Sequence, residues 1–468
     1  MKKQLLFTSI FLLFTLISQA QWETDLRLTN DPAASYTSYN NAKCIATSGN
    51  DVHVVWYDSR DGNNEIYYKR STNGGLGWGV DTRLTNDALI SMDPSITVSG
   101  SNVHIVWSDN RDGNYEIYYK SSPDGGSNWS ADIRLTNNSG SSEIPSVSVF
   151  GSLVHVVWTD NRDGNIEVYN KFSTDGGSTW SPDTRLTNDL VPSRYPSGSV
   201  SGTDVHVVWY DNRNGNWEVY YKRSSDGGLN WGADTRLTND ISVSQFPLVT
   251  AVNSFVNVVW SDNRDGNSEV YYKNSTDGGL SWGTDTRLTN NSSASWPSSL
   301  DVSGQAVHVA WSDERDGNTE IYYKSSADGG LNWAADTRLT NSSALSWNPS
   351  ISVSGAVVHV VWQDYRDGNN EIYYKRDSTG NFIGINETFD SGNTIQIFPN
   401  PFSNEIKVTG KITEPCEIII YDLTSRKLLQ NKFTGTSIIN TSNLAKGIYI
   451  FEVRNENTVL KKGKIIKN

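Results

Sequence analysis

The sequence predicts an all-β protein whose larger part repeats one unit seven times. A tryptophan that ends a short β-branched run recurs every 51 positions. Around one of these tryptophans, β-rich runs at 103–107, 116–120 and 129–135 are separated by Asp-Gly turns, and a Pro-Ser-Val-Ser-Val type run precedes each unit. Four antiparallel strands in roughly 50 residues are typical of a β-propeller blade, so we expect seven blades. The tryptophans are Trp56, Trp107, Trp158, Trp209, Trp260, Trp311 and Trp362.

The two ends of the repeated part complement each other. The seventh unit continues through 371–375 and then lacks its fourth run. The missing segment, Trp-x-x-Asp-x-Arg-Leu-Thr-Asn, stands instead at 22–30. We therefore expect the N-terminal strand to complete the last blade and close the ring, which leaves no open sheet edge.

The composition divides the chain into four segments. Residues 1–20 have two lysines, a short apolar run and Ser-Gln-Ala, as in a cleaved secretory signal peptide. Residues 21–376 are the expected propeller, and 377–394 are a linker rich in Ser, Thr, Gly and Asn. Residues 395–468 alternate apolar and polar positions and predict a small β-sandwich domain. No segment is apolar for long enough to predict a transmembrane helix.

The last segment carries specific motifs. They are Phe-Pro-Asn-Pro-Phe at 398–402, Ile-Tyr-Asp-Leu at 420–423, Gly-Ile-Tyr-Ile-Phe at 447–451 and a lysine-rich end. With these motifs the segment resembles a type A sorting domain of the type IX secretion system. The resemblance implies that residues 395–468 engage that secretion machinery, and that the protein is secreted, either extracellular or attached to the outer-membrane surface.

A turn segment, Ser-x-Asp-x-Gly-x-x-Trp, follows the third strand of most units. Its carboxylate can accept hydrogen bonds from N–H groups of its own turn, and glycine supplies positive φ. This segment is the Asp-box, and with it the repeated part resembles sialidase-like BNR-repeat propellers. In that family the motif lies away from the ligand face, so we expect a structural role. The aspartates are Asp124, Asp175, Asp226, Asp277 and Asp328.

A second motif, Asp-x-Arg-Asp-Gly-Asn-x-Glu in most units, joins the second and third strands. It is expected on the face opposite the Asp-boxes, which we call the upper face. Either its arginines form ion pairs that brace the blades, or they form a repeated ligand site; bracing is favoured because every blade keeps them. The arginines are Arg60, Arg111, Arg162, Arg213, Arg264, Arg315 and Arg366.

Residues that break the repeat are the candidates for specificity. They gather between each Arg-Leu-Thr-Asn segment and the next first strand, in predicted upper-face loops. Aromatic side chains there suit stacking on sugars or gripping a partner, although they could instead fill crevices between blades. The candidate ligand-binding residues are Arg194, Tyr195, Phe246, Trp296 and Trp347.

The remaining features limit the classes of ligand. Six histidines share one position of the second strand on separate blades, so they are not expected to converge on a metal, and no cofactor is predicted. The net charge of −13 disfavours nucleic acid as a partner. A monomer is expected.

These features favour a binding protein that recognises glycans or glycosylated surfaces through a non-catalytic propeller. A sialidase-like exo-glycoside hydrolase is one alternative. The resemblance would imply three arginines on a sugar carboxylate, but only Arg194 lies outside the repeats, the Arg-Ile-Pro motif is absent, and no catalytic residue is assigned. A protein-interaction platform is the second alternative, since the fold alone does not fix the function.

Overall fold

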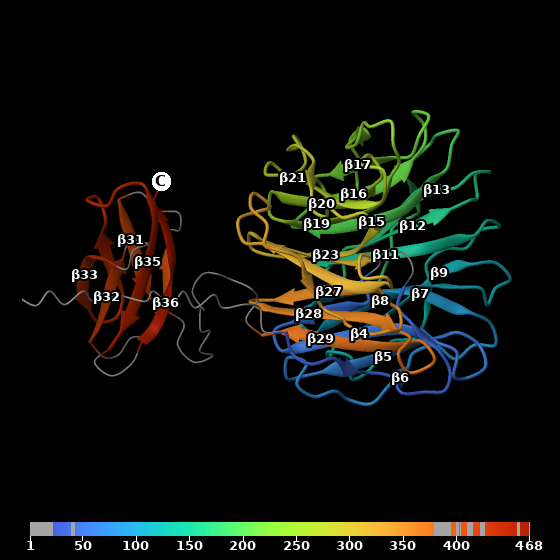
Figure 1. The fold of residues 1–468 in the computed structure, drawn as a ribbon, viewed down its shortest axis with the longest axis horizontal. Coiled ribbons are helices and arrows are strands. Elements are labelled where there is room, and N and C mark those ends of the chain that lie inside the picture. The colour runs from blue at the N-terminus through green and yellow to red at the C-terminus, as the bar shows by residue number, and fades with distance from the viewer. Residues whose placement is uncertain are drawn as a thin grey trace, which may run out of the picture. The chain divides into compact units, whose positions relative to one another are not determined.

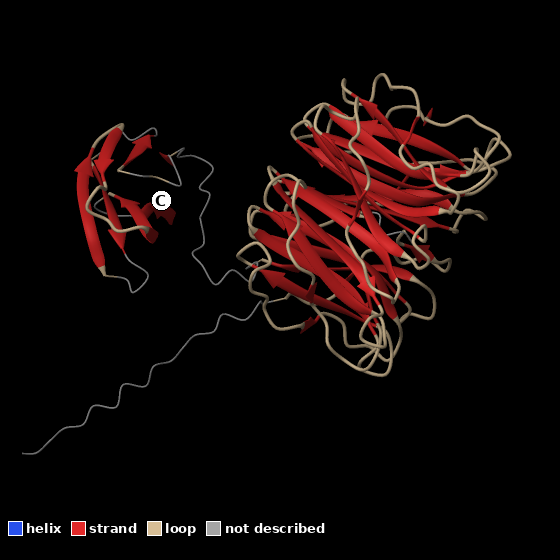
Figure 2. Ribbon diagram, turned by 90° about the horizontal axis from the view of Figure 1, so that it is seen from above, coloured by secondary structure: helices blue, strands red, loops and turns tan. Residues whose placement is uncertain are grey.

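The chain forms two compact units, Met1–Asn381 and Phe382–Asn468. The computed structural model describes residues 22–38, 43–378, 395–398, 402, 404–409, 415–421, 426–455 and 459–467. The predicted signal peptide and nearly all of the predicted linker lie outside these residues. Every regular element in the described part is a strand, which confirms the all-β prediction (Figure 2). Accordingly, no helix that could cross a membrane occurs there.

The described part of the first unit contains seven sheets of four principal strands each, joined antiparallel. They resemble propeller blades. In chain order they contain β2 (Ser35–Tyr36), β3 (Ile45–Ser48), β4 (Asp51–Asp58), β5 (Glu65–Ser71) and β6 (Thr82–Arg83); β7 (Ser91–Ser99), β8 (Asn102–Asp109), β9 (Glu116–Ser122) and β10 (Ile133–Arg134); β11 (Ser142–Phe150), β12 (Leu153–Asp160), β13 (Glu167–Ser173) and β14 (Thr184–Arg185); β15 (Ser193–Ser201), β16 (Asp204–Asp211), β17 (Glu218–Ser224) and β18 (Thr235–Arg236); β19 (Ser244–Val252), β20 (Phe255–Asp262), β21 (Glu269–Ser275) and β22 (Thr286–Arg287); β23 (Ser295–Ser303), β24 (Ala306–Asp313), β25 (Glu320–Ser326) and β26 (Thr337–Arg338); and β27 (Ser346–Ser354), β28 (Val357–Asp364) and β29 (Glu371–Asp377) with β1 (Leu26–Arg27).

The fourth strands are shorter than the sequence predicts. In the sheet of β7–β10, only Ile133 and Arg134 of the predicted run 129–135 pair with β9. Trp129 precedes the strand and instead packs edge-on against Tyr68 of the preceding sheet, with ring centroids 4.9 Å apart. The predicted run therefore combines a contact between sheets with a two-residue strand.

The N-terminal segment lies in the same sheet as the last repeat. Leu26 pairs with Tyr374 and Arg27 pairs with Tyr373, so β1 is the strand next to β29. The N–H of Leu28 also donates to the carbonyl of Ile372, at 2.8 Å. The segment thus supplies the fourth strand that the seventh unit lacks.

The first strands of the sheets pack against one another. Each of β3, β7, β11, β15, β19, β23 and β27 contacts the next, and β27 contacts β3. Figure 1 shows β27–β29, in orange, beside β4–β6, in blue. Side-chain oxygens join neighbouring first strands: Ser199 Oγ accepts from the N–H of Ala251 at 3.0 Å, and Asp301 Oδ2 accepts from that of Val353 at 2.8 Å.

The second unit has two sheets around one core that includes Ile406, Ile418, Ile439 and Phe451. This arrangement fits the predicted sandwich. One sheet contains β30 (Gln396–Phe398), β31 (Glu405–Thr409) and β34 (Ser437–Asn440), and the other contains β33 (Lys427–Phe433), β32 (Cys416–Tyr421), β35 (Gly447–Arg454) and β36 (Val459–Lys467).

Candidate functional site

The repeated arginines are held by carboxylates of their own sheets. Arg111 donates from Nε and Nη2 to Asp109 at 2.8 and 2.6 Å, and from Nη1 to Asp132 at 2.9 Å. Its guanidinium also lies 4.4 Å from the ring centre of Tyr118. Burial opposes ionisation of Asp109, yet the hydrogen bonds from Arg111 and Trp107 hold its pKa below the ordinary value. All three guanidinium nitrogens of Arg111 therefore already donate to carboxylates of the protein.

This geometry refines the expected bracing. Asp109 ends the second strand, and Asp132 immediately precedes the fourth strand of the same sheet, so the principal pairs tie together strands of one sheet. Neighbouring sheets are reached in only some units of the described part, as in the pair of Arg213 with Asp189, at 2.9 Å. In the last sheet Arg366 binds Asp25 at 2.7 Å, which ties the N-terminal segment to the turn between β28 and β29.

A row of lysines joins the sheets, and sequence reasoning missed it. Lys120 Nζ donates to the carbonyl of Leu84 in the preceding sheet at 2.6 Å and pairs with Asp132 at 2.8 Å. Lys69 reaches Leu28 in the same way, which links the first sheet to the segment that contains β1. The signal in the sequence was a lysine that recurs at one position in the third strand of each sheet. The lysines are Lys69, Lys120, Lys171, Lys222, Lys273, Lys324 and Lys375.

The Asp-box turn makes contacts within itself and with the neighbouring sheet. Asp124 Oδ1 accepts from the N–H groups of Ser127 and Asn128 at 3.1 and 2.8 Å. Hydrogen bonds from the side chain and backbone of Asn128 lower the pKa of Asp124 to about 2. Gly126 has φ +87°, and a Cβ there would lie 2.0 Å from Oη of Tyr68 in the preceding sheet. The second glycine therefore meets both a backbone and a packing requirement.

The buried histidines occupy the same position in the second strands of separate sheets. His104 Nδ1 lies 2.7 Å from Oη of Tyr119, and burial lowers the pKa of His104 to about 4. Asn257 takes the equivalent place and accepts a hydrogen bond from Tyr272 at 2.7 Å. Among the described residues, no three His, Cys, Asp or Glu side chains gather as a metal site would require.

The five candidate ligand residues lie in first strands, and the prediction that they occupy loops is wrong. Arg194 and Tyr195 belong to β15, Phe246 to β19, Trp296 to β23 and Trp347 to β27. Each lies at or beside a register shift near the start of its strand. Such bulges re-aim side chains and are common beside functional sites. No residue pattern in the sequence marks them.

Backbone strain concentrates at these bulges. Six non-glycine residues of the described part have positive φ, and five of them occupy the bulged position of a first strand. This conformation costs on the order of 1–3 kcal/mol for each residue and is enriched at functional sites. The five residues are Asp93, Ile144, Tyr195, Phe246 and Asn348.

Two of these bulges bring aromatic rings together. Tyr195 stacks on Tyr210 with centroids 5.6 Å apart, and Phe246 lies edge-on to both, at 5.2 and 5.5 Å. Trp217 lies edge-on to Tyr210 at 5.2 Å. Tyr210 is buried, whereas the other three rings are half-buried. We call Tyr195, Tyr210, Trp217 and Phe246 the aromatic cluster.

The aromatic cluster includes two of the predicted residues, Tyr195 and Phe246, and a third, Arg194, lies beside it. Arg194 Cζ lies 5.7 Å from the ring centre of Trp217, so Arg194, Tyr195 and Phe246 share one site. Trp296 and Trp347 are half-buried in two other sheets. Tyr210 and Trp217 were not predicted. Their signal is a side chain that changes at a fixed repeat position: Ser108 and Ser261 correspond to Tyr210.

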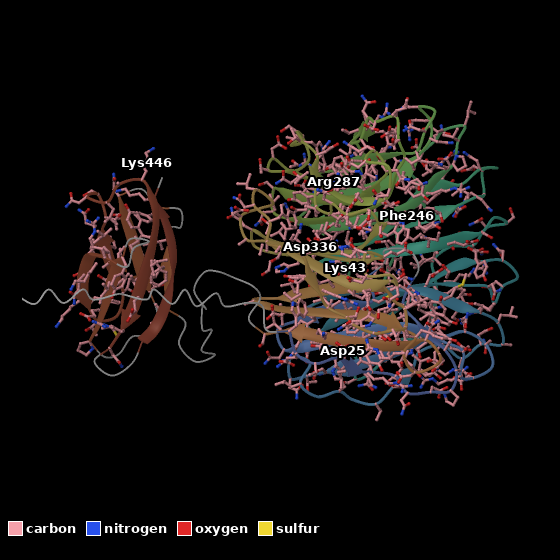
Figure 3. All side chains as sticks on the ribbon, in the orientation of Figure 1. Asp25, Lys43, Phe246, Arg287, Asp336 and Lys446 are labelled. Atoms are coloured by element: carbon pink, nitrogen blue, oxygen red, sulfur yellow. The ribbon has the colours of Figure 1, made fainter. Side chains whose placement is uncertain are left out.

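Two further features lie near the first strands. Burial raises the pKa of Glu143 in β11, and burial followed by the charges of Glu143 and Asp93 raises that of Tyr115. A cavity of about 180 Å³ is lined mainly by β11, β15, β19 and β23. Within it Lys43 Nζ lies 2.9 Å from Asp301 Oδ1, and Figure 3 shows Lys43 toward the middle of the array of sheets.

Comparison with solved structures supports the propeller-like class of the first unit. The polysaccharide lyase Uly1 matches with a TM-score of 0.55 and 10% identity, over 76% of this chain and 99% of that chain. A PL25 ulvan lyase bound to -[GlcA(1-4)Rha3S]- has the same score and identity, over 75% and 95%. The Hadza microbial sialidase Hz136 has a TM-score of 0.43 and 14% identity, over 69% and 73%. At 10% identity, the likeness to the two lyases concerns the fold alone.

The second unit identifies the route of export. Residues 396–468 match the family described as the secretion system C-terminal sorting domain. The chain is therefore a protein exported by the type IX secretion system, and it is extracellular or on the cell surface. No curated protein is detectably similar in sequence to this chain.

Proposed function

We propose that the seven sheets form a closed, seven-bladed propeller that serves as a binding frame. The pairing of β1 with β29 and the contact of β27 with β3 support closure. The lysine row, which links each sheet to the preceding one, supports it independently. In this proposal the repeated arginines and the Asp-box aspartates maintain the frame, since their principal hydrogen bonds are made within it.

The propeller's proposed function is to bind glycans at its upper face. The observation that carries this proposal is the aromatic cluster, whose half-buried rings lie beside Arg194 at two strained bulges. Aromatic faces suit the apolar faces of sugar rings, and a preformed site loses little conformational entropy on binding. In the same proposal, Trp296 and Trp347 extend the site along neighbouring sheets, and export to the cell exterior brings the protein to glycans.

A glycan array with the full mature chain tests this function. We expect Phe246→Ala to lower affinity for the best glycan at least tenfold, because it removes a ring that would contact the sugar. Phe150→Ala is the matched control: Phe150 is 55% exposed but lies at the other end of its first strand. Equal affinities for the two variants would contradict the proposed site, as would a wild-type chain that binds no glycan.

Catalysis on a glycan is the second candidate. The observation that favours it is Glu143, whose raised pKa and position beside Tyr115 suit a general acid. Turnover of fluorogenic glycosides would establish an enzyme, and so would formation of an unsaturated product from acidic polysaccharides. In either case Glu143→Gln should abolish the activity. Binding without turnover would leave the non-catalytic function.

A further inference from the structure

Arg194 has an exceptional electrostatic environment. Each other arginine in the described part of the first unit lies within 4.0 Å of a carboxylate, and Arg194 does not. Its Nε is buried without a hydrogen-bond partner, as are those of Arg60, Arg70, Arg223 and Arg236, but each of these four arginines still pairs with a carboxylate through another nitrogen. A partly buried cation with an unsatisfied donor is costly unless something else supplies the acceptor.

The surroundings of Arg194 leave room for such an acceptor. The guanidinium lies over Trp217, at a distance typical of cation–π contacts, and the side chain is half-buried. The two Nη nitrogens of Arg194 donate a hydrogen bond to no described residue, and neither of them is buried. Arg194 can therefore offer a fork of N–H donors that is already oriented by the aromatic ring below it.

The charge is also specific to one sheet. The residues that follow the first serine of the other first strands are Tyr36, Met92, Glu143, Gln245, Trp296 and Trp347. None of these is a cation. Glu143 lies in β11 and Asp93 in β7, on the two sheets that precede the sheet of Arg194. The positive charge beside the aromatic cluster is therefore next to negative charge on the preceding sheets. A ligand with one acidic group would be oriented by this difference.

We infer that Arg194 binds an acidic group of the glycan while Tyr195 and Phe246 contact the adjoining sugar ring. The acidic group is an oxyanion, either the carboxylate of a uronic acid or a sulfate ester, because both accept paired N–H donors from a guanidinium. This inference rests on the proposed glycan-binding function and assigns the class of ligand for that site.

The test compares an oligogalacturonate, its fully methyl-esterified form and a sulfated neutral oligosaccharide as probes for the full mature chain. We expect tighter binding of at least one acidic probe than of the ester, with affinity that falls as salt rises. Arg194→Gln should weaken acidic-probe binding by about tenfold to a hundredfold and leave binding of the ester within about twofold. Arg223→Gln is the matched control, since Arg223 already pairs with Asp204 at 2.9 Å.

The outcomes separate the inference from the function on which it rests. Equal affinity for the acidic and esterified probes, together with an Arg194→Gln substitution that leaves affinity unchanged, overturns the inference. If Phe246→Ala still abolishes binding, the proposed glycan site stands. Absence of binding to these probes and to every glycan on the array overturns both. Thermal melts report whether Arg194→Gln folds, and if it does not, the comparison of acidic and esterified probes on the wild-type chain decides.

Discussion

The repeated arginines stabilise the sheets because each one pairs with a buried aspartate at the end of a second strand. Asp211 is fully buried and accepts from Arg213 Nη2 at 2.6 Å, while the same guanidinium reaches Asp234 at 2.7 Å. A buried carboxylate that loses its cation costs far more than an exposed ion pair contributes. The repeated arginines are therefore expected to influence stability much more than ligand binding.

Replacement of one repeated arginine tests this difference. Arg213→Ala should lower the free energy of unfolding by about 3–5 kcal/mol, because Asp211 is left buried and unpaired. Arg223→Ala, which breaks a partly exposed pair with Asp204, should cost about 0–1 kcal/mol. Denaturant titration of both variants provides the measurement. An unchanged unfolding midpoint for Arg213→Ala, together with lost glycan binding, would favour the repeated ligand site instead.

The buried histidines predict a loss of stability in mild acid. Burial lowers the folded-state pKa of His104 to about 4, whereas the unfolded value is near 6.5. The unfolded chain therefore takes up the proton first, and the stability present above pH 6.5 is lost as the pH falls toward 4.

His104→Asn tests this linkage, because Asn257 already occupies the equivalent position and bonds Tyr272. The variant should lose less stability than the wild type between pH 7 and pH 4.5, by on the order of 3 kcal/mol at most. Melting temperatures across that range provide the measurement. Parallel pH profiles for the two proteins would show that His104 does not contribute.

Among the repeated elements, the Asp-box turn connects neighbouring sheets through close packing. Gly126→Ala should destabilise the fold strongly, since the new Cβ would meet Oη of Tyr68 at 2.0 Å. Gly113→Ala is the matched control: Gly113 also has positive φ, +103°, but no atom lies within 4 Å of the new Cβ. The control should cost roughly 1–2 kcal/mol from backbone strain alone. Equal unfolding midpoints for the two variants would contradict the packing role.

The sequence allows the strands to be predicted better than the site. The 51-residue period locates the second and third strands because tryptophan and the Asp-Gly turn recur without change. The bulges in β15 and β19 escape such reasoning, because Tyr195 and Phe246 are not residues that ordinarily mark positive φ. Arg194 was found as an exception to the repeat, but its lack of a carboxylate partner depends on three-dimensional surroundings.

Taken as a whole, the first unit depends on contacts between its two ends. The segment around β1 supplies Arg27 and Thr29 to the fully buried Glu371, and Asp25 to Arg366. Sequence complementarity was sufficient to predict this partnership, because the missing fourth strand and the extra N-terminal strand share one motif. The lysine contact with Leu28 was not predicted, because sequence periodicity does not reveal which backbone oxygen a side chain reaches.

Deletion of residues 21–30 should give an aggregating or loosely folded product. The fully buried Glu371 would lose Arg27 and Thr29, Arg366 would lose Asp25, and β29 would expose an open edge. Leu26→Ala is the control, because this side chain is 42% exposed and the change keeps the backbone pairing of β1. Size-exclusion chromatography and near-UV circular dichroism provide the measurements. A monodisperse deletion variant with a native spectrum would show that the N-terminal strand is dispensable.

The crystal structure of the full mature chain with its tightest-binding oligosaccharide would test most directly whether recognition belongs to residues that break the repeat. We predict a sugar ring against Tyr195 and Phe246, with an acidic group on Arg194. A ligand held by the recurring Asp109 and Arg111 positions, or one bound away from the bulged first strands, would contradict this account.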